Sequence, residues 1–183
     1  GFLRGVADLA RKYDVLLIAD EVATGFGRTG AMFACELEGV CPDILCVAKG
    51  LTAGYLPVAA TMTTDDIYHA FTGELADRRT FYHGHTFTGN PLGCAAALAN
   101  LSLFDSRNVL KHARESSEII RRRLGDMKDP HKFPHVVDIR QRGLMVGIEL
   151  ARDRQTRQPF DFSRTIGARL GLAMRPDRKS TRL

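Results

Sequence analysis

Apolar positions along the chain alternate between continuous runs and helical spacing, a pattern typical of an α/β protein. The continuous runs predict strands that are buried on both faces, at residues 15–19, 44–48 and 58–62. The helical spacing predicts helices over residues 1–13, 64–71, 91–104, 108–124 and 163–174. Asn90 and Pro91 mark the start of one helix, and Thr64 is placed to cap another.

The linker at residues 129–134, with two prolines, predicts a domain boundary. Residues 1–128 are then part of a large domain, and residues 129–174 begin a smaller α+β domain with a hairpin over 136–140 and 144–150. The first helix has no capping residue or initiator Met before it, and residues 175–183 continue without an apolar pattern. We expect a piece of a longer protein that ends in a disordered or non-native tail.

Composition and charge narrow the class of protein. Hydrophobic residues make up 44% and charged residues 26% of the 183 positions, as in ordinary soluble proteins. No run approaches the roughly 20 apolar residues of a membrane span, and no secretory leader is recognisable. The last nine residues carry four basic and one acidic side chain, so they hold +3 of the net charge of +5. We therefore expect no nucleic-acid partner and no membrane association.

The four cysteines do not have the spacing of a metal site or of a redox pair. We expect buried thiols in a reducing cytoplasm, and no metal, from these residues: Cys35, Cys41, Cys46 and Cys94.

Two charged residues each end an apolar strand: Asp20 follows the first run and Lys49 the second. Either one alone is as readily explained by a loop residue that pairs with its neighbours. Together, at the carboxyl ends of strands, they indicate a ligand site. A cofactor with an aldehyde on a pyridine ring needs these two groups, because an amine condenses with the aldehyde and a carboxylate keeps the ring nitrogen protonated.

The loop over residues 81–91 leads into a helix N-terminus, where hydroxyls and free N–H groups suit a phosphate. A plain capping loop explains the same pattern equally well. His83 and His85 are candidate ligands or bases, although loop histidines usually are neither.

Three segments resemble the class III aminotransferases: residues 17–30, 42–51 and 83–97. The resemblance implies the type I fold of the enzymes that depend on pyridoxal 5'-phosphate, and a homodimer with a shared active site. It implies that Asp20 contacts the ring nitrogen, that Val22 packs on the ring and that Lys49 binds the aldehyde. Thr86 would reach the phosphate in the partner subunit, and the substrate would lie near Arg28 and Gly84.

Ala23 stands where many members of the class have Gln. Together with the cysteine-bearing stretches, it resembles the branch that transfers an amino group from S-adenosylmethionine to 8-amino-7-oxononanoate in biotin synthesis. The alternatives are other ω-amine or diamine aminotransferases, including those with lysine as amino donor. We expect the 183-residue chain alone to be inactive, because the family's other phosphate-binding and ring-stacking residues have no match in it.

The dinucleotide fingerprint at Gly25, Gly27 and Gly30 offers a different function, that of a dehydrogenase. The fingerprint should open a crossover helix, but residues 31–40 are too few for one before Pro42. A non-catalytic interaction protein is also disfavoured, because Asp20 and Lys49 are both present.

Overall fold

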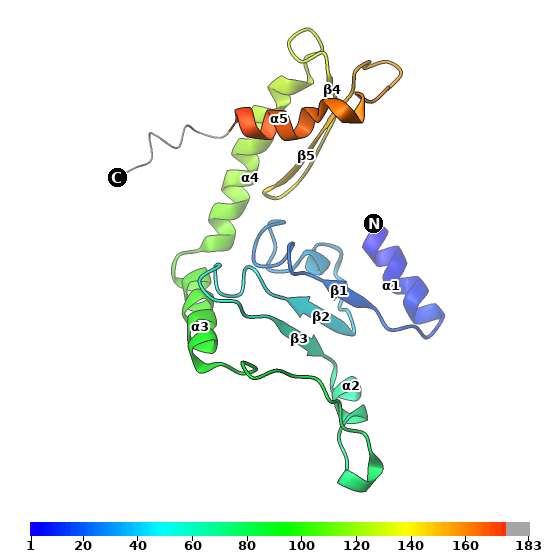
Figure 1. The fold of residues 1–183 in the computed structure, drawn as a ribbon, viewed down its shortest axis with the longest axis vertical. Coiled ribbons are helices and arrows are strands. Elements are labelled where there is room, and N and C mark those ends of the chain that lie inside the picture. The colour runs from blue at the N-terminus through cyan, green and yellow to red at the C-terminus, as the bar shows by residue number, and fades with distance from the viewer. Residues whose placement is uncertain (175–183) are drawn as a thin grey trace. The chain divides into compact units, whose positions relative to one another are not determined.

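The computed structural model describes residues 1–174, so the tail predicted at residues 175–183 lies outside the described residues. The chain forms two compact units (Figure 1). The first contains Gly1–Ser117 with Arg142–Met145, and the second contains Glu118–Gln141 and the described residues from Val146 onward. Helices and strands are mixed along the chain, which agrees with the expected α/β class. The domain boundary at residue 129 stays a prediction.

A three-stranded sheet lies within the first unit. Its strands, in spatial order, are β1 (Ile18–Asp20), β2 (Ile44–Val47) and β3 (Ala60–Thr63). β1 and β2 are parallel, with Asp20 opposite Cys46, whereas β2 and β3 are antiparallel, with Val47 opposite Ala60. Parallel strands end at the same edge of a sheet. The residues that follow β1 and β2 are therefore brought to one edge.

Helix α1 (Phe2–Lys12) has the amphipathic spacing that the sequence predicts, and it packs on the 3-10 helix η1 (Ala34–Glu38). Arg4 fastens the two elements, because its main-chain N–H donates to Glu38 Oε2 at 2.8 Å and its guanidinium donates to the Gly39 carbonyl at 2.7 Å. The small apolar core between them contains Ala7, Cys35 and Val40.

Helix α3 (Pro91–Ser106) begins where the sequence predicts, since Asn90 Oδ1 accepts the Leu92 N–H at 3.0 Å. Helix α2 (Asp65–Ala70) also begins as expected, and η2 (Leu75–Asp77) follows it. The predicted capping role of the Thr64 side chain is wrong. Thr64 enters the helix only through its carbonyl, which accepts the Tyr68 N–H at 3.1 Å.

The later elements are helix α4 (Val109–Gly125), η3 (Asp126–Lys128), the hairpin strands β4 (Val136–Arg142) and β5 (Met145–Leu150), η4 (Phe162–Arg164) and α5 (Ile166–Ala173). In the second unit, Arg140 of β4 forms ion pairs with Asp138 and with Glu149 of β5. The last helix starts later than predicted, because Thr165 has a left-handed backbone (φ 44°) that separates η4 from α5.

The two-sided burial predicted for the first and third strands is wrong in the described chain, where β1 and β3 are mostly exposed. Val15, Leu16 and Ile18 are each 59% exposed. The strand begins only at Ile18, and β1 is the edge strand of the sheet that the structure describes. An edge strand has one hydrogen-bonded neighbour, so its side chains have fewer atoms to pack against.

The prediction of four buried thiols is wrong for two of them. Cys35 is buried and Cys46 half-buried, but Cys41 and Cys94 are exposed, and all four are free. Cys41 lies in the loop before β2, and Cys94 lies in the first turns of α3. Within residues 1–174 no cluster of side chains suits a metal ion, and no helix is both long and apolar enough to cross a membrane.

Candidate active site

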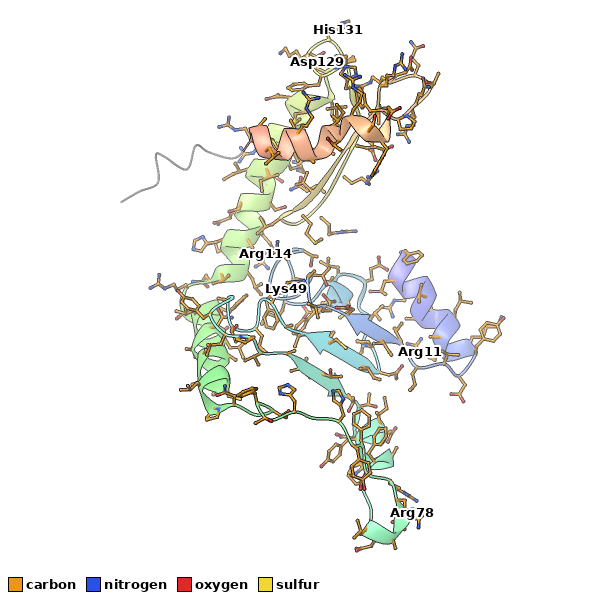
Figure 2. The ribbon with its side chains drawn as sticks, viewed as in Figure 1. Arg11, Lys49, Arg78, Arg114, Asp129 and His131 are labelled. Carbon is orange, nitrogen blue, oxygen red and sulfur yellow. The ribbon has the colours of Figure 1, made fainter. Side chains whose placement is uncertain are left out.

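Asp20 and Lys49 lie at the same edge of the sheet. Asp20 is the last residue of β1, and Lys49 comes two residues after β2, the parallel neighbour of β1. The pairing continues past the end of β1, because the Glu21 N–H donates to the Cys46 carbonyl at 2.8 Å. Both Asp20 and Lys49 are exposed, and Figure 2 labels Lys49 beyond the end of β2. The predicted carboxylate and amine thus come from the ends of two neighbouring strands, β1 and β2.

Alternation of side chains at the end of β1 fixes the direction of Asp20. Asp20 Oδ1 accepts the Val22 N–H at 3.0 Å, which closes a small turn on the exposed side. The intervening Glu21 points inward and is 3% exposed. Its Oε1 accepts the Cys35 N–H at 2.8 Å, and its Oε2 accepts the Thr24 hydroxyl. A buried carboxylate is costly unless it is hydrogen-bonded, and both Glu21 oxygens have a donor. The bond to Cys35 ties the loop after Asp20 to η1.

Phe26 joins this loop to the lysine turn. Its backbone is left-handed, with φ 59°, which is rare for a residue other than glycine. Its ring lies edge-on to Phe33 at 5.7 Å and to Phe104 of α3 at 6.2 Å between centroids. Gly50, the residue after Lys49, lies against the Phe26 side chain. A Cβ added at Gly50 would lie 2.5 Å from Phe26 Cβ. The Phe26 side chain therefore packs where the two segments meet.

We expect Gly50→Ala to lower the free energy of unfolding by about 1–3 kcal/mol, the usual cost of overpacking, because the new methyl group meets Phe26. Gly5→Ala is the matched control. An added Cβ there meets nothing within 4 Å, and alanine in a helix gains about 0.5–1 kcal/mol over glycine. Urea unfolding of the full-length gene product measures both. Equal stabilities of the two variants would contradict the close packing at Gly50.

The turn after Lys49 is held from two sides. Within the turn, the Leu51 N–H donates to the Ala48 carbonyl at 2.6 Å. From α3, Asn100 Nδ2 donates to the carbonyls of Gly50 at 2.8 Å and of Leu51 at 3.0 Å. The Lys49 side chain thus stands on a backbone that is fixed by a helix.

Arg28 is exposed, and the backbone around it is fixed by residues of the same unit. The Leu144 N–H donates to the Arg28 carbonyl at 2.9 Å, and Arg114 donates to the Gly30 carbonyl at 3.2 Å. In the part of the chain that the structure describes, the buried Thr29 hydroxyl has no hydrogen-bond partner. The structure places Arg28 on the loop that follows Asp20, together with Val22.

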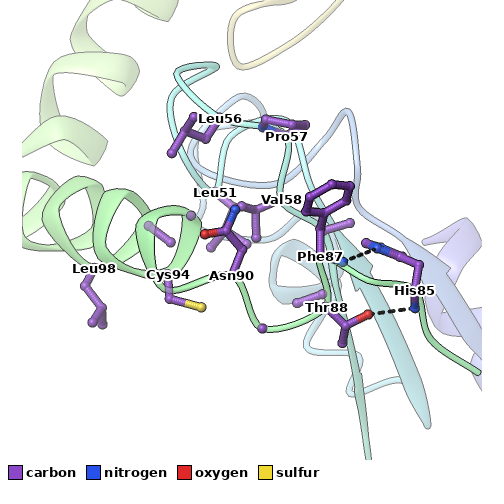
Figure 3. A pocket seen from close by; sticks show the side chains of 15 residues that line it. Leu51, Leu56, Pro57, Val58, His85, Phe87, Thr88, Asn90, Cys94 and Leu98 are labelled. Atoms are coloured by element: carbon purple, nitrogen blue, oxygen red, sulfur yellow. Dashed lines mark hydrogen bonds between the residues drawn. The ribbon is translucent and has the colours of Figure 1, made fainter.

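The predicted phosphate loop directly precedes α3 in the chain. Gly84 and Thr86 are exposed there, in a different loop from Asp20 and Lys49. The loop holds its own shape, because the His85 N–H donates to Thr88 Oγ1 at 3.0 Å and the Phe87 N–H donates to His85 Nδ1 at 3.1 Å. A pocket of about 870 Å³ opens beside it (Figure 3), lined by residues that include Leu51, Val58, Phe87, Asn90, Cys94 and Leu98.

Cys35, whose main-chain N–H donates to Glu21, has a thiol that is a weaker acid than a free cysteine. Burial, and then the nearby Glu21 carboxylate, raise the pKa of its thiol to about 11. A free thiol in an unfolded chain has a pKa of about 8.5, so the folded state holds its proton to a higher pH than the unfolded state. This stabilisation is present below about pH 8.5 and is lost as the pH rises toward 11.

We therefore expect the free energy of unfolding to fall more steeply between pH 8.5 and about 11 in the native protein than in Cys35→Ala. Groups that titrate in both proteins cancel in this comparison. Cys41→Ala, at an exposed thiol, should keep the native slope. Urea unfolding at a series of pH values gives the slopes, and parallel curves for native protein and Cys35→Ala would contradict the prediction.

The donor set at this edge fits pyridoxal phosphate. The cofactor requires a carboxylate for its ring nitrogen and a primary amine for its aldehyde, and Asp20 and Lys49 supply these from adjacent strand ends. Sequence reasoning missed three residues that support the pair: Glu21, Phe26 and Asn100. For Asn100 a signal existed, because it is the only amide in an apolar stretch of α3 and lies at helical spacing from Gly93 and Ala97.

Comparison with known proteins supports the same assignment. Residues 1–176 match the model of the aminotransferase class III family. A relative from Geobacter sulfurreducens, named adenosylmethionine-8-amino-7-oxononanoate aminotransferase, is 51% identical over 175 residues, which cover 96% of this chain and 38% of that protein. One of the same name from Nitratidesulfovibrio vulgaris is 53% identical over 175 residues, covering 96% of this chain and 32% of that protein.

The fold agrees as well. The crystal structure of an enzyme of that name from Methanocaldococcus jannaschii superposes with a TM-score of 0.87 at 48% identity, covering 93% of this chain and 39% of that chain. This chain thus spans about 38% of the length of the first relative named above. The α/β fold and the expected resemblance are both confirmed, and the chain belongs to the class III aminotransferase family.

Proposed function

We propose that the full-length protein is a pyridoxal-phosphate aminotransferase that moves an amino group from S-adenosylmethionine to 8-amino-7-oxononanoate. The observation that carries the proposal is the placement of Asp20 and Lys49 at one edge of the parallel pair β1 and β2. The substrates follow from the relatives at about 50% identity, whose name contains both compounds. The homodimer and the cytoplasmic location expected from the resemblance belong to the same proposal.

Each residue has a distinct role in this proposal. When bound, the cofactor supplies an electron sink for the bond that breaks at the carbon bearing the amine. Lys49 holds the cofactor through its amine, and once substrate displaces it, Lys49 moves a proton to and from that carbon. Asp20 keeps the ring nitrogen protonated, and the turn to the Val22 N–H holds its carboxylate in place.

The remaining predicted residues bind and orient. Val22, half-buried after Asp20, packs on the ring. Thr86 donates a hydrogen bond to the phosphate of the partner subunit's cofactor. Arg28 and Gly84 contact the substrate, and the hydrogen bond between Leu144 and the Arg28 carbonyl fixes the loop that presents the arginine.

A second candidate function is transfer from another ω-amine. The crystal structure of a thermostable (S)-enantioselective omega-transaminase from Thermomicrobium roseum superposes with a TM-score of 0.83 at 37% identity. The lower identity favours the first candidate. A third possibility is that lysine gives the amino group to the same keto acid. The experiment below distinguishes lysine from S-adenosylmethionine as the donor.

The test uses the full-length gene product loaded with pyridoxal phosphate. The visible absorption of the lysine-bound cofactor is followed while S-adenosylmethionine and then 8-amino-7-oxononanoate are added. Loss of the band with the donor and its return with the keto acid are expected. A response only to lysine changes the donor, and a response only to other ω-amines favours the second candidate. If no band forms with pyridoxal phosphate, the proposed function is wrong.

A further inference from the structure

The side chain of Asn100 fastens the turn that carries Lys49 to α3. Its amide nitrogen donates to the carbonyls of Gly50 at 2.8 Å and Leu51 at 3.0 Å. A side-chain amide has two N–H donors, and these bonds use both. The two carbonyls belong to the two residues that directly follow Lys49.

The sequence of α3 lets this amide come close. Gly93 and Ala97 are buried and lie on the same face of the helix as Asn100, at spacings of four and three residues. An added Cβ at Gly93 would lie 2.5 Å from Val58 Cγ2, so this face approaches the segment after Lys49 closely. Figure 3 shows Leu51 and Val58 beside α3. Small residues at two positions thus bring the amide of the third within reach of the turn.

Other contacts also hold this segment, and within the described residues Asn100 is the side chain whose hydrogen bonds tie its start to α3. The buried Thr52 hydroxyl donates to the Leu56 carbonyl at 2.6 Å, which closes the later turn. The backbone at Gly50 and Leu51 sets where the exposed Lys49 side chain begins, so it limits the positions that the amine can reach. A displacement of about 1 Å at such a group is enough to lower a reaction rate strongly.

We propose that Asn100 is a positioning residue for Lys49, which it holds in place for covalent capture of the cofactor. This inference rests on the proposed function. In the captured state a bond joins the Lys49 nitrogen to the aldehyde carbon, and the aldehyde oxygen leaves as water. Asn100 touches neither group and acts only through the carbonyls of Gly50 and Leu51.

The experiment compares two cofactor forms in the full-length gene product. Pyridoxal phosphate forms the bond to Lys49, whereas pyridoxamine phosphate, which has no aldehyde, binds without it. Asn100→Asp keeps the shape of the side chain but places oxygen opposite both carbonyls. We expect its affinity for pyridoxal phosphate to fall about tenfold, as the loss of two hydrogen bonds implies, while its affinity for pyridoxamine phosphate stays at the native value.

Two further variants keep the test decisive. Asn100→Ser retains one short donor, and it is used alone if Asn100→Asp does not fold. Its loss of pyridoxal phosphate affinity should be smaller, again with pyridoxamine phosphate unchanged. Ser106→Ala is the matched control on α3, because the Ser106 hydroxyl donates to the Ser102 carbonyl of its own helix at 2.8 Å, away from the lysine turn. It should bind both forms as the native protein does.

Each outcome has one meaning. An equal loss for both cofactor forms, or no loss for either, would overturn the positioning role of Asn100. The proposed function fails separately, in the native protein, if pyridoxal phosphate produces no visible band of the lysine-bound form.

Discussion

Replacing Lys49 with alanine is expected to abolish the visible band of the lysine-bound cofactor and to lower turnover about ten-thousandfold. Lys49 has two tasks in the proposed function, the bond to the aldehyde and the transfer of a proton, and alanine removes both. The side chain is exposed at the end of β2 and stabilises no core. The fold should therefore survive the change. Absorption spectra, steady-state rates and thermal unfolding of the full-length gene product measure the three effects.

The controls separate charge from chemistry. Lys49→Arg keeps a positive charge at the same position but does not condense with an aldehyde at neutral pH, so it should be as inactive as the alanine variant. Lys111→Ala removes an exposed lysine of α4 that pairs with Glu115 at 3.9 Å. It should leave the band and the rate unchanged. Turnover by Lys49→Ala within tenfold of the native rate would refute the assignment of Lys49.

Asp20→Asn is expected to lower kcat roughly a hundredfold while the protein keeps its fold and its lysine-bound band. The amide oxygen of asparagine can still accept the Val22 N–H, which Asp20 Oδ1 accepts at 3.0 Å. The loop geometry is thus preserved, and only the negative charge beside the ring nitrogen is lost. Without that charge the ring nitrogen loses its proton more easily, so the ring becomes a weaker electron sink. Steady-state kinetics with thermal unfolding separate this effect from destabilisation.

Asp43→Asn is the matched control for Asp20→Asn. Asp43 also accepts one main-chain N–H, that of Leu17 at 2.7 Å, but it precedes β2 and so lies at the opposite end of that strand from Lys49. Its replacement should leave kcat unchanged. If both asparagine variants lost the same activity, the loss would not come from a charge at the ring nitrogen.

The sequence predicted best those elements whose ends are set by local chemistry. Helix α3 begins at Pro91 as expected, because the Asn90 side chain caps it and proline suits its first turn. Helix α1 runs over its predicted apolar stripe without a side-chain cap, because helical spacing of apolar residues is itself a local signal. The shared edge of Asp20 and Lys49 was also predictable, since parallel strands of an α/β sheet end at the same edge.

The features that escaped prediction depend on partners far along the chain. The start of β1 at Ile18 depends on pairing with Ile44, and apolar residues before it look the same in sequence. The burial of Glu21 depends on the Cys35 N–H, and the role of Asn100 depends on two carbonyls about 50 positions earlier. A window of neighbouring residues contains none of these partners. The roles of Val22, Arg28, Gly84 and Thr86 stay predictions.

The left-handed backbone of Phe26 has a consequence for the order of folding. That conformation costs about 1–2 kcal/mol locally, so the loop adopts it only when Gly50 and Phe104 are already in place around the ring. Contacts between distant segments form late, whereas the turns of α3 are local and form early. We therefore expect the Phe26 amide, which donates to the Met32 carbonyl, to gain protection from hydrogen exchange after the amides of α3. The loop that follows Asp20 is then completed on an α3 that has already formed.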